Sequence, residues 1–364
     1  MIVRKNDKIM RDFFLHDNRA LLVEGARQTG KTFSIRRVGK ECFTNFVEIN
    51  FYENPDAKEL FYEARSAKDI INIIRECFEY RTPVDNFIHK RMMEMVRLYL
   101  IVGGMPAVVQ KFIDTNNLRS VANLQRDIIQ LYRRDISKYD SNNKLQIEEI
   151  YDLIPSELNA KNKRFILKSL NEKCRFSKYE DSFVWLKDAG VAIATYNVEE
   201  PRVPLLLSKQ RNLFKLFLND VGLLASQYAG DIQKKLLNDE ISINYGSIFE
   251  NLVAQELYSH GIAGYSQSLY YFNSKKQGEI DFVIELNGKV IPIEVKSGKD
   301  YQRHNALKGV LSNPEYSISE AITFCQGNVE VVDKIVYLPI YMLMFLKNNE
   351  EQDIEYKFDL TGLK

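Results

Sequence analysis

The stretch EIDFVIELNGKVIPIEVKSG, from Glu279 to Gly298, carries the clearest structural signal in the C-terminal part of this chain. Two apolar runs flank an Asn-Gly pair at 287–288, and Asn-Gly favours the tight turn of a β-hairpin. Asp281 lies on the first expected strand, whereas Glu294 and Lys296 lie two residues apart on the second and therefore share one face. The stretch predicts a hairpin that brings two carboxylates and a lysine together.

These three side chains suit metal-assisted hydrolysis. Carboxylates that converge from neighbouring strands can hold Mg²⁺, and a lysine beside them can orient or help deprotonate an attacking water. We therefore take Asp281 and Glu294 as candidate metal ligands and catalytic residues, with Lys296 as the third catalytic residue. The alternative is a surface cluster of salt bridges. His260 and His304 have no partner at metal-binding spacing, so we expect them to be packing or surface residues.

A second motif lies near the start of the chain, in LLVEGARQTGKTF at 21–33. It has the G-x-x-x-x-G-K-[ST] spacing of a phosphate-binding loop, between an apolar run and a helical pattern. In such a loop the backbone amides turn towards phosphate oxygens, Lys31 would bridge the β and γ phosphates of ATP, and Thr32 would ligate Mg²⁺. The alternative is a glycine-rich turn that binds nothing. The predicted ATP-binding residues are Gly25, Ala26, Arg27, Gln28, Thr29, Gly30, Lys31 and Thr32.

The second half of an ATPase site is not evident in the sequence. ATP hydrolysis of this kind needs a further carboxylate at the end of a hydrophobic strand. The segment NFVEINFYENPD at 45–56 is typical of a strand, but Glu53 and Asp56 do not follow an unbroken apolar run. No later run of four apolar residues ends in Asp-Glu. The sequence therefore predicts ATP binding and leaves hydrolysis open.

The order of motifs along the chain resembles a known family, the prokaryotic AAA-type ATPases that carry a C-terminal domain with a restriction-endonuclease-like fold. The resemblance covers nearly the whole chain and implies ATP-driven conformational change coupled to a module that faces nucleic acid. It also implies that Asp281 and Glu294-x-Lys296 form a nuclease pattern, with Glu250 as an additional acidic metal ligand. The matching motifs are GARQTGKT from Gly25, YLIVGGMPAVV from Tyr99, YRRDISKY from Tyr132, IFENLVAQEL from Ile248 and the stretch from Glu279.

The chain departs from this family near Arg75. Family members have a long segment between the second strand and the GGMP helices, and this segment carries the acidic Mg²⁺ strand and the rest of the sheet. Here INIIR runs directly into ECFEY, which indicates an internal deletion. The expected fold class is multidomain α/β, with a shortened P-loop ATP-binding domain at 1–75, a helical lid-like region at 76–140, a winged-helix-like domain at 141–205 and a restriction-endonuclease-like domain at 206–364.

The middle of the chain offers a possible DNA-binding surface. Helical patterns followed by two strands indicate a winged helix, and Lys161 to Lys178 contains five lysines and two arginines against one glutamate. Such a stretch can contact DNA phosphates, and packing between domains is an equal alternative. Arg133 and Arg134 could act as arginine fingers, although we favour a solvated face. Trp185 is expected in the core.

Composition limits the remaining classes. The net charge is +1, so any nucleic-acid surface must be a local patch. The four cysteines form no CxxC pair, which fits a reducing compartment, and the apolar run at 335–346 is too short to span a bilayer. We expect a cytoplasmic protein without a membrane partner, and its oligomeric state is open. Two alternatives to an ATP-binding protein remain: a metal-dependent nuclease with a vestigial P-loop, and a non-catalytic DNA- or protein-binding module.

Overall fold

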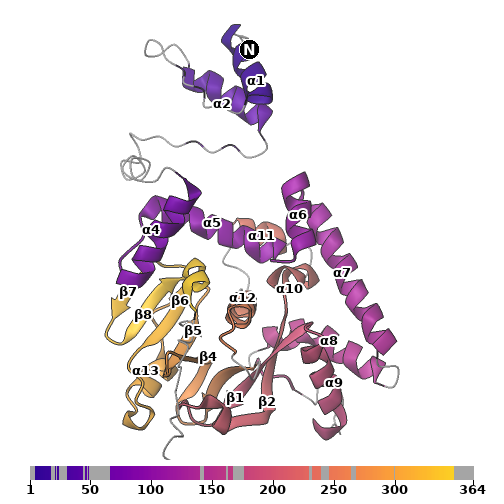
Figure 1. Cartoon of the computed structure of the whole chain (residues 1–364), viewed down its shortest axis with the longest axis vertical. Coiled ribbons are helices and arrows are strands. Elements are labelled where there is room, and N and C mark those ends of the chain that lie inside the picture. Colours follow the sequence, from indigo (N-terminus) through magenta and orange to yellow (C-terminus); the bar gives the residue numbers. More distant parts are fainter. Residues whose placement is uncertain are drawn as a thin grey trace, which may run out of the picture. The chain divides into compact units, whose positions relative to one another are not determined.

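The computed structural model divides the chain into two compact units, Met1–Glu63 and Ala64–Lys364, which are described separately (Figure 1). The residues that the structure describes are 5–17, 21, 23, 31–43, 46, 48, 66–139, 143–160, 163–166, 176–228, 232–238, 246–263, 268–298 and 300–347.

The first unit contains two described helices, α1 (Lys5–His16) and α2 (Lys31–Cys42). They are joined by an ion pair between Arg37 and the buried carboxylate of Asp7, and by the rings of Phe14 and Phe43, whose centroids lie 5.3 Å apart. Helix α2 confirms the helix that was predicted to follow the phosphate loop. Residues 24–30 of the loop, and most of the two expected strands, lie outside the described residues.

The second unit is α/β, with helices around a mixed eight-stranded sheet in the order β2-β1-β3-β4-β5-β6-β8-β7. The strands are β1 (Ala192–Val198), β2 (Lys209–Leu218), β3 (Leu269–Ser274), β4 (Gly278–Leu286), β5 (Lys289–Val295), β6 (Ala321–Cys325), β7 (Glu330–Val332) and β8 (Ile335–Pro339). Its helices are α4 (Ala67–Tyr80), α5 (Asn86–Val102), α6 (Pro106–Thr115), α7 (Leu118–Tyr139), α8 (Lys144–Asn159), α9 (Phe176–Asp188), α10 (Val221–Gln227), α11 (Ile232–Leu237), α12 (Gly246–Ser259) and α13 (Asn305–Leu311), with short 3-10 helices η2 (Leu205–Ser208), η3 (Pro314–Tyr316) and η4 (Ile340–Phe345).

The predicted hairpin is confirmed. Strands β4 and β5 pair antiparallel from Phe282 opposite Ile293 to Leu286 opposite Lys289. The turn residues Asn287 and Gly288 have φ values of 52° and 74°, the left-handed conformations that a two-residue hairpin turn requires. The turn and the strand register together fix which residues of β4 and β5 are neighbours.

Helix α12 is amphipathic in sequence but nearly encircled by the protein. Its residues from Ser247 to Ala254 are buried, and the helix packs on β1, β2, β3 and β5 (Figure 1). A second apolar cluster joins Leu307 and Val310 of α13 to β4, β6 and β8. Packing of α12 and α13 therefore holds these strands in place, and it positions the polar side chains that the strands carry.

Within the range expected for a winged helix, 141–205, the structure describes one strand, β1, and this strand belongs to the large sheet. Strand β1 pairs antiparallel with β2, and it also pairs parallel with β3, where Thr195 lies opposite Leu269. The expected boundary at 205/206 thus falls between two hydrogen-bonded neighbours, and the boundary at 75/76 falls inside α4. Helices α8 and α9 pack on each other, α8 on β2 and α9 on β1. The two compact units divide after residue 63, so the three expected limits, 75/76, 140/141 and 205/206, all lie within the second unit.

A sharp corner joins α5 and α6 at the GGMP motif. Gly103 has a φ of 75°, and the N–H of Gly104 donates to Asp220 Oδ2 at 2.7 Å. Asp220 also caps α10 by accepting from the N–H of Leu223 at 2.9 Å. No single described helix has the length and apolar content to cross a bilayer, and α5 with α6 meets that test only as a pair bent by 115°.

Candidate functional site

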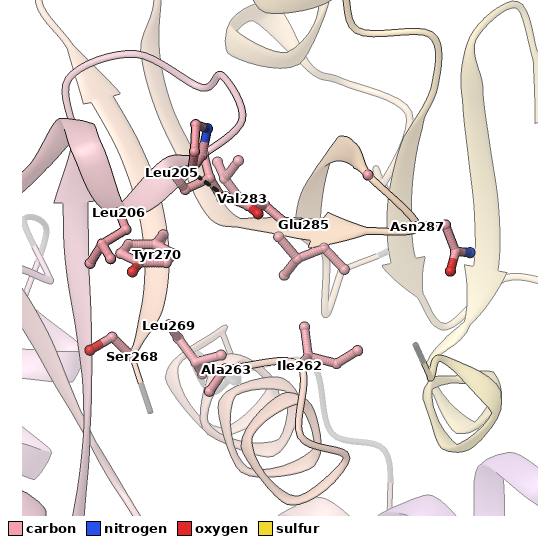
Figure 2. Close-up of a pocket in the computed structure, with 13 residues that line it drawn as sticks. Leu205, Leu206, Ile262, Ala263, Ser268, Leu269, Tyr270, Val283, Glu285 and Asn287 are labelled. Carbon is pink, nitrogen blue, oxygen red and sulfur yellow. Dashed lines mark hydrogen bonds between the residues drawn. The ribbon is translucent and has the colours of Figure 1, made fainter. Parts of the chain in front are cut away.

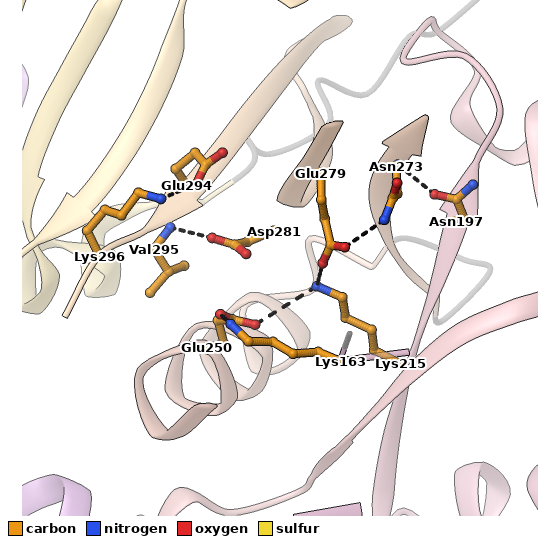
Figure 3. Close-up of polar contacts among 10 residues, drawn as sticks. All are labelled: Lys163, Asn197, Lys215, Glu250, Asn273, Glu279, Asp281, Glu294, Val295 and Lys296. Carbon is orange, nitrogen blue, oxygen red and sulfur yellow. Dashed lines mark hydrogen bonds and ion pairs between the residues drawn. The ribbon is translucent and has the colours of Figure 1, made fainter. Parts of the chain in front are cut away.

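The predicted C-terminal site residues come together at the strand ends beside α12 (Figure 3). Asp281 and Glu294 are the next residues of β4 and β5 beyond the paired residues Phe282 and Ile293, so the strand register places them opposite each other. Two lysines from distant parts of the sequence and one further glutamate join the four predicted residues. We call this group the carboxylate–lysine cluster; its members are Lys163, Lys215, Glu250, Glu279, Asp281, Glu294 and Lys296.

The hairpin side of the cluster consists of Asp281, Glu294 and Lys296. Asp281 Oδ2 accepts from the N–H of Val295 at 2.8 Å, which ties the side chain of one strand to the backbone of the next. Lys296 Nζ lies 2.9 Å from Glu294 Oε2. Glu294 is buried, whereas Lys296 and Asp281 are partly exposed. The two carboxylates and the lysine are thus neighbours, as the sequence predicts.

On the helix side of the cluster, Glu250 was predicted from the sequence, but its lysine partners were not. Lys215 Nζ lies 2.6 Å from Glu279 Oε1 and 3.9 Å from Glu250 Oε2, and Lys163 Nζ contacts Glu250 Oε1. Lys215 is fully buried. The sequence contains one signal for this pairing, because Lys215 lies within the apolar run LFKLFL at 213–218. A lysine is almost never buried without a partner, so its position predicts a nearby acid. Lys163 belongs to the stretch for which DNA contact was considered.

A chain of side-chain amides extends from the cluster across the sheet. Asn273 Nδ2 donates to Glu279 Oε2 at 2.6 Å, and the N–H of Asn273 donates to Asn197 Oδ1 at 2.8 Å (Figure 3). Asn197 Nδ2 in turn donates to Gln210 Oε1 at 2.6 Å. Because both oxygens of Glu279 are engaged, this carboxylate is a fixed counter-charge for Lys215.

Burial and like charge raise the pKa of the two most buried carboxyl groups. Burial, followed by repulsion from Asp281, raises the pKa of Glu294 to about 8 and that of Glu250 to about 6. Burial alone lowers the pKa of a lysine, but the surrounding carboxylates outweigh it, so the pKa values of Lys163 and Lys215 are raised. The two lysines are therefore held in the charged form. The raised pKa values of Glu250 and Glu294 show that the lysines do not fully offset burial and repulsion at these two carboxyl groups.

Two carboxylates of the cluster, rather than three, are placed to bind a hard divalent cation. Oxygen ligands such as Asp281 and Glu294 suit Mg²⁺. Within the described ranges, no three His, Cys, Asp or Glu side chains are arranged to share one metal ion. The predicted third ligand, Glu250, is instead paired with Lys163 and Lys215, although its Oε2 has no hydrogen-bond donor. Glu250 is therefore beside the site and engaged by lysine.

The remaining predicted residues have mostly structural partners. Lys31 and Thr32 begin α2, and the other loop residues, Gly25 to Gly30, lie outside the described residues. Arg133 pairs with Asp152 at 2.6 Å, as expected for a structural rather than a phosphate-sensing arginine. His260 Nδ1 lies 3.0 Å from the carbonyl oxygen of Leu346, and His304 Nε2 lies 3.1 Å from the hydroxyl of Tyr337.

A separate cavity of about 420 Å³ lies beside the β4–β5 turn (Figure 2). Its lining is largely apolar, and its carboxylate, Glu285, already accepts a hydrogen bond from the N–H of Leu205. None of the carboxylate–lysine cluster lines this cavity. The concentration of charged groups therefore identifies the cluster, rather than the cavity, as the candidate site.

Comparisons with known proteins assign two segments of the chain. Residues 93–234 match a family described as Domain of unknown function (DUF8612), and residues 245–343 match Domain of unknown function (DUF4143). The second match contains Glu250, Asp281, Glu294 and Lys296. No curated protein matches. The crystal structure of protein VC1899 from Vibrio cholerae aligns with 13% identity and a TM-score of 0.22 over 62% of this chain and 54% of that one.

Proposed function

We propose that the second unit is a Mg²⁺-dependent phosphodiesterase that acts on DNA, with its active centre at the carboxylate–lysine cluster. One observation carries the proposal: the β4–β5 register brings Asp281 beside Glu294, and Lys296 Nζ lies 2.9 Å from Glu294 Oε2. Two converging carboxylates can hold a cation for metal-assisted hydrolysis, and an adjacent lysine can orient the attacking water.

Each residue of the site has a distinct role in this proposal. Asp281 and Glu294 hold the cation, which supplies a Lewis acid for the phosphate and lowers the pKa of a bound water. Lys296, whose side chain is 32% exposed, orients the attacking water and can move towards a phosphate oxygen at the surface. The hydrogen bond from Val295 fixes Asp281, so one ligand is positioned before the cation arrives.

The test is cleavage of plasmid and oligonucleotide DNA by the full chain with Mg²⁺ or Mn²⁺. We expect Asp281→Asn and Glu294→Gln to reduce the rate at least about 100-fold, the scale on which loss of transition-state charge stabilisation acts. Asp333→Asn changes an exposed carboxylate of the same unit and should cleave like the parent. Absence of cleavage with every divalent ion, or full activity in Asp281→Asn, would overturn the proposal.

We propose as a second function that the first unit binds ATP. The supporting observation is that α2 begins at Lys31, directly after the glycine-rich spacing, so the helix N-terminus adjoins the motif. Equilibrium binding of ATP with Mg²⁺ should be lost in Lys31→Ala and kept in Lys40→Ala, which removes an exposed lysine from the last turn of the same helix. Equal binding by both variants would exclude the motif. If only Lys31→Ala loses binding, phosphate release then decides whether bound ATP is hydrolysed.

A further inference from the structure

We propose that Lys163 is an internal competitor of the divalent cation: its ammonium holds Glu250, and a metal ion recruits Glu250 only by displacing it. This inference rests on the proposed metal site at Asp281 and Glu294. It concerns a residue that none of the predicted site chemistry includes, and it makes metal affinity depend on a lysine contributed from between α8 and α9.

Glu250 is held asymmetrically. Lys163 Nζ contacts Oε1, whereas Oε2 is buried without a hydrogen-bond donor and lies 3.9 Å from Lys215 Nζ (Figure 3). A buried carboxylate oxygen without a donor costs free energy that a cation can recover. Glu250 can therefore become a metal ligand, because Lys163 contacts one of its carboxylate oxygens and the other accepts no hydrogen bond.

The two lysines beside Glu250 differ in their freedom to leave. The side chain of Lys215 is 0% exposed and has Glu279 as a second, closer partner. The side chain of Lys163 is 23% exposed, so its ammonium can reach water by rotation of a flexible four-carbon stem. Lys163 is thus the cation that an incoming metal ion can replace.

The backbone next to Lys163 is anchored, which confines the exchange to the side chain. The N–H of Phe165 donates to the carbonyl of Phe214 at 2.9 Å, and the N–H of Ile166 donates to Glu157 Oε2 at 3.0 Å. The ring of Phe165 also stacks on that of Phe214, with centroids 6.1 Å apart. Departure of the ammonium therefore leaves this anchor on β2 intact.

Charge balance favours the exchange. The cluster has four carboxylates and three lysines, so its formal charge is −1 when all are ionised. A divalent cation changes this to +1, and departure of Lys163 then returns it to zero. Because net charge in a poorly solvated site is costly, binding of the metal ion and expulsion of Lys163 are coupled.

The experiment measures Mn²⁺ affinity by calorimetry and by electron paramagnetic resonance of free Mn²⁺, using the full chain. Lys163→Met keeps the apolar stem and removes the charge, so we expect it to bind Mn²⁺ about 10-fold more tightly than the parent, which corresponds to loss of one competing ion pair. Lys178→Met removes an exposed lysine from the same basic stretch and should match the parent.

Further variants separate the possible outcomes. If Lys163→Met folds poorly without metal, Mn²⁺ should raise its melting temperature more than that of the parent, whereas Lys163→Met with Glu250→Gln should show no gain.

Equal affinity in the parent and Lys163→Met, with binding lost in Asp281→Asn, would overturn the competitor role and leave the proposed metal site standing. An equal gain in Lys178→Met would reduce the effect to overall charge and also overturn the role. Absence of Mn²⁺ binding in every variant would overturn the metal site itself.

Discussion

The ammonium of Lys215 lies 2.6 Å from the carboxylate of Glu279, although two strands, β1 and β3, separate β2 from β4 in the sheet. The long side chain passes beside Tyr271 of β3, with Nζ 4.9 Å from the ring centroid. A fully buried lysine is thereby satisfied by an acid, an aromatic ring and a second acid, Glu250, at 3.9 Å. This contact links the edge of the sheet to the candidate site.

Removal of Lys215 should destabilise the second unit strongly. Lys215→Met leaves the buried Glu250 and the partly exposed Glu279 with less compensation, and breaking a buried ion pair on one side costs about 3–5 kcal/mol. Urea unfolding should show this loss, whereas Lys276→Met, in the exposed β3–β4 turn, should remain close to the parent. Adding Glu279→Gln should restore part of the loss. A change below about 1 kcal/mol, the typical value of an exposed pair, would contradict the buried-network interpretation.

Gly103 should tolerate a methyl group much less well than another glycine with a positive φ. An added Cβ at Gly103 would lie 2.2 Å from Asp220 Oδ1, whereas at Gly190 nothing lies within 4 Å. Gly190 has a φ of 68°, so Gly190→Ala measures the strain of a positive φ without a steric contact, about 1 kcal/mol. Gly103 combines a φ of 75° with a ψ of −169°, a region that is essentially restricted to glycine, so backbone strain there adds to the steric contact. Gly103→Ala should cost about 1–3 kcal/mol more, because the methyl group displaces the carboxylate that holds the corner. Equal losses of unfolding free energy would show that the corner can yield.

Local signals explain which features the sequence could predict. The Asn287–Gly288 turn is specified by two adjacent residues, and alternation along the strands then places Asp281 and Glu294 together. The helix at α2 follows equally from a local pattern. Features decided by a few neighbouring residues were thus accessible without a structure.

Long-range pairing explains what the sequence could not predict. Helices followed by a strand are compatible both with a winged helix and with the edge of a larger sheet, and only the pairing of β1 with β3, about seventy residues later, distinguishes them. The burial of Lys215 and Lys163 is likewise decided by acids on α12 and β4. A lysine next to hydrophobic residues reveals that something must neutralise it, but not which carboxylate does so.

His304 should make stability depend on mildly acidic pH. Its side chain is 3% exposed, its Nε2 lies 3.1 Å from the hydroxyl of Tyr337, and burial, with Lys296 and Lys308 nearby, lowers its pKa to about 4. Because the folded-state pKa lies below the unfolded value of about 6.5, the stabilisation is complete above pH 6.5 and is lost as pH falls towards 4.

The pH effect can be isolated by comparison with His304→Gln. Relative to this variant, the parent should lose about 1–3 kcal/mol of unfolding free energy between pH 6.5 and pH 4, measured by urea denaturation at each pH. His16→Gln alters an exposed histidine of α1 and should keep the parental pH dependence. Parallel curves for the parent and His304→Gln would mean that His304 accepts its proton without penalty.

Asn328 should hold the α4–α5 connection against the sheet. Its Oδ1 accepts from the N–H of Val84 at 2.9 Å, and its Nδ2 donates to the carbonyl of the same residue at 2.6 Å. Asn328→Asp keeps the acceptor but loses the donor, and it places a carboxylate oxygen against the carbonyl oxygen of Val84. The variant should therefore lose about 1–3 kcal/mol of unfolding free energy. Amide hydrogen exchange should accelerate first in α4 and the start of α5, because these elements lose their link to the β6–β7 turn. Asn123→Asp, on the exposed face of α7, should leave exchange there unchanged. Acceleration confined to β7, with α4 still protected, would show that α4 is held instead by its contacts with η4, such as Phe78 against Phe345.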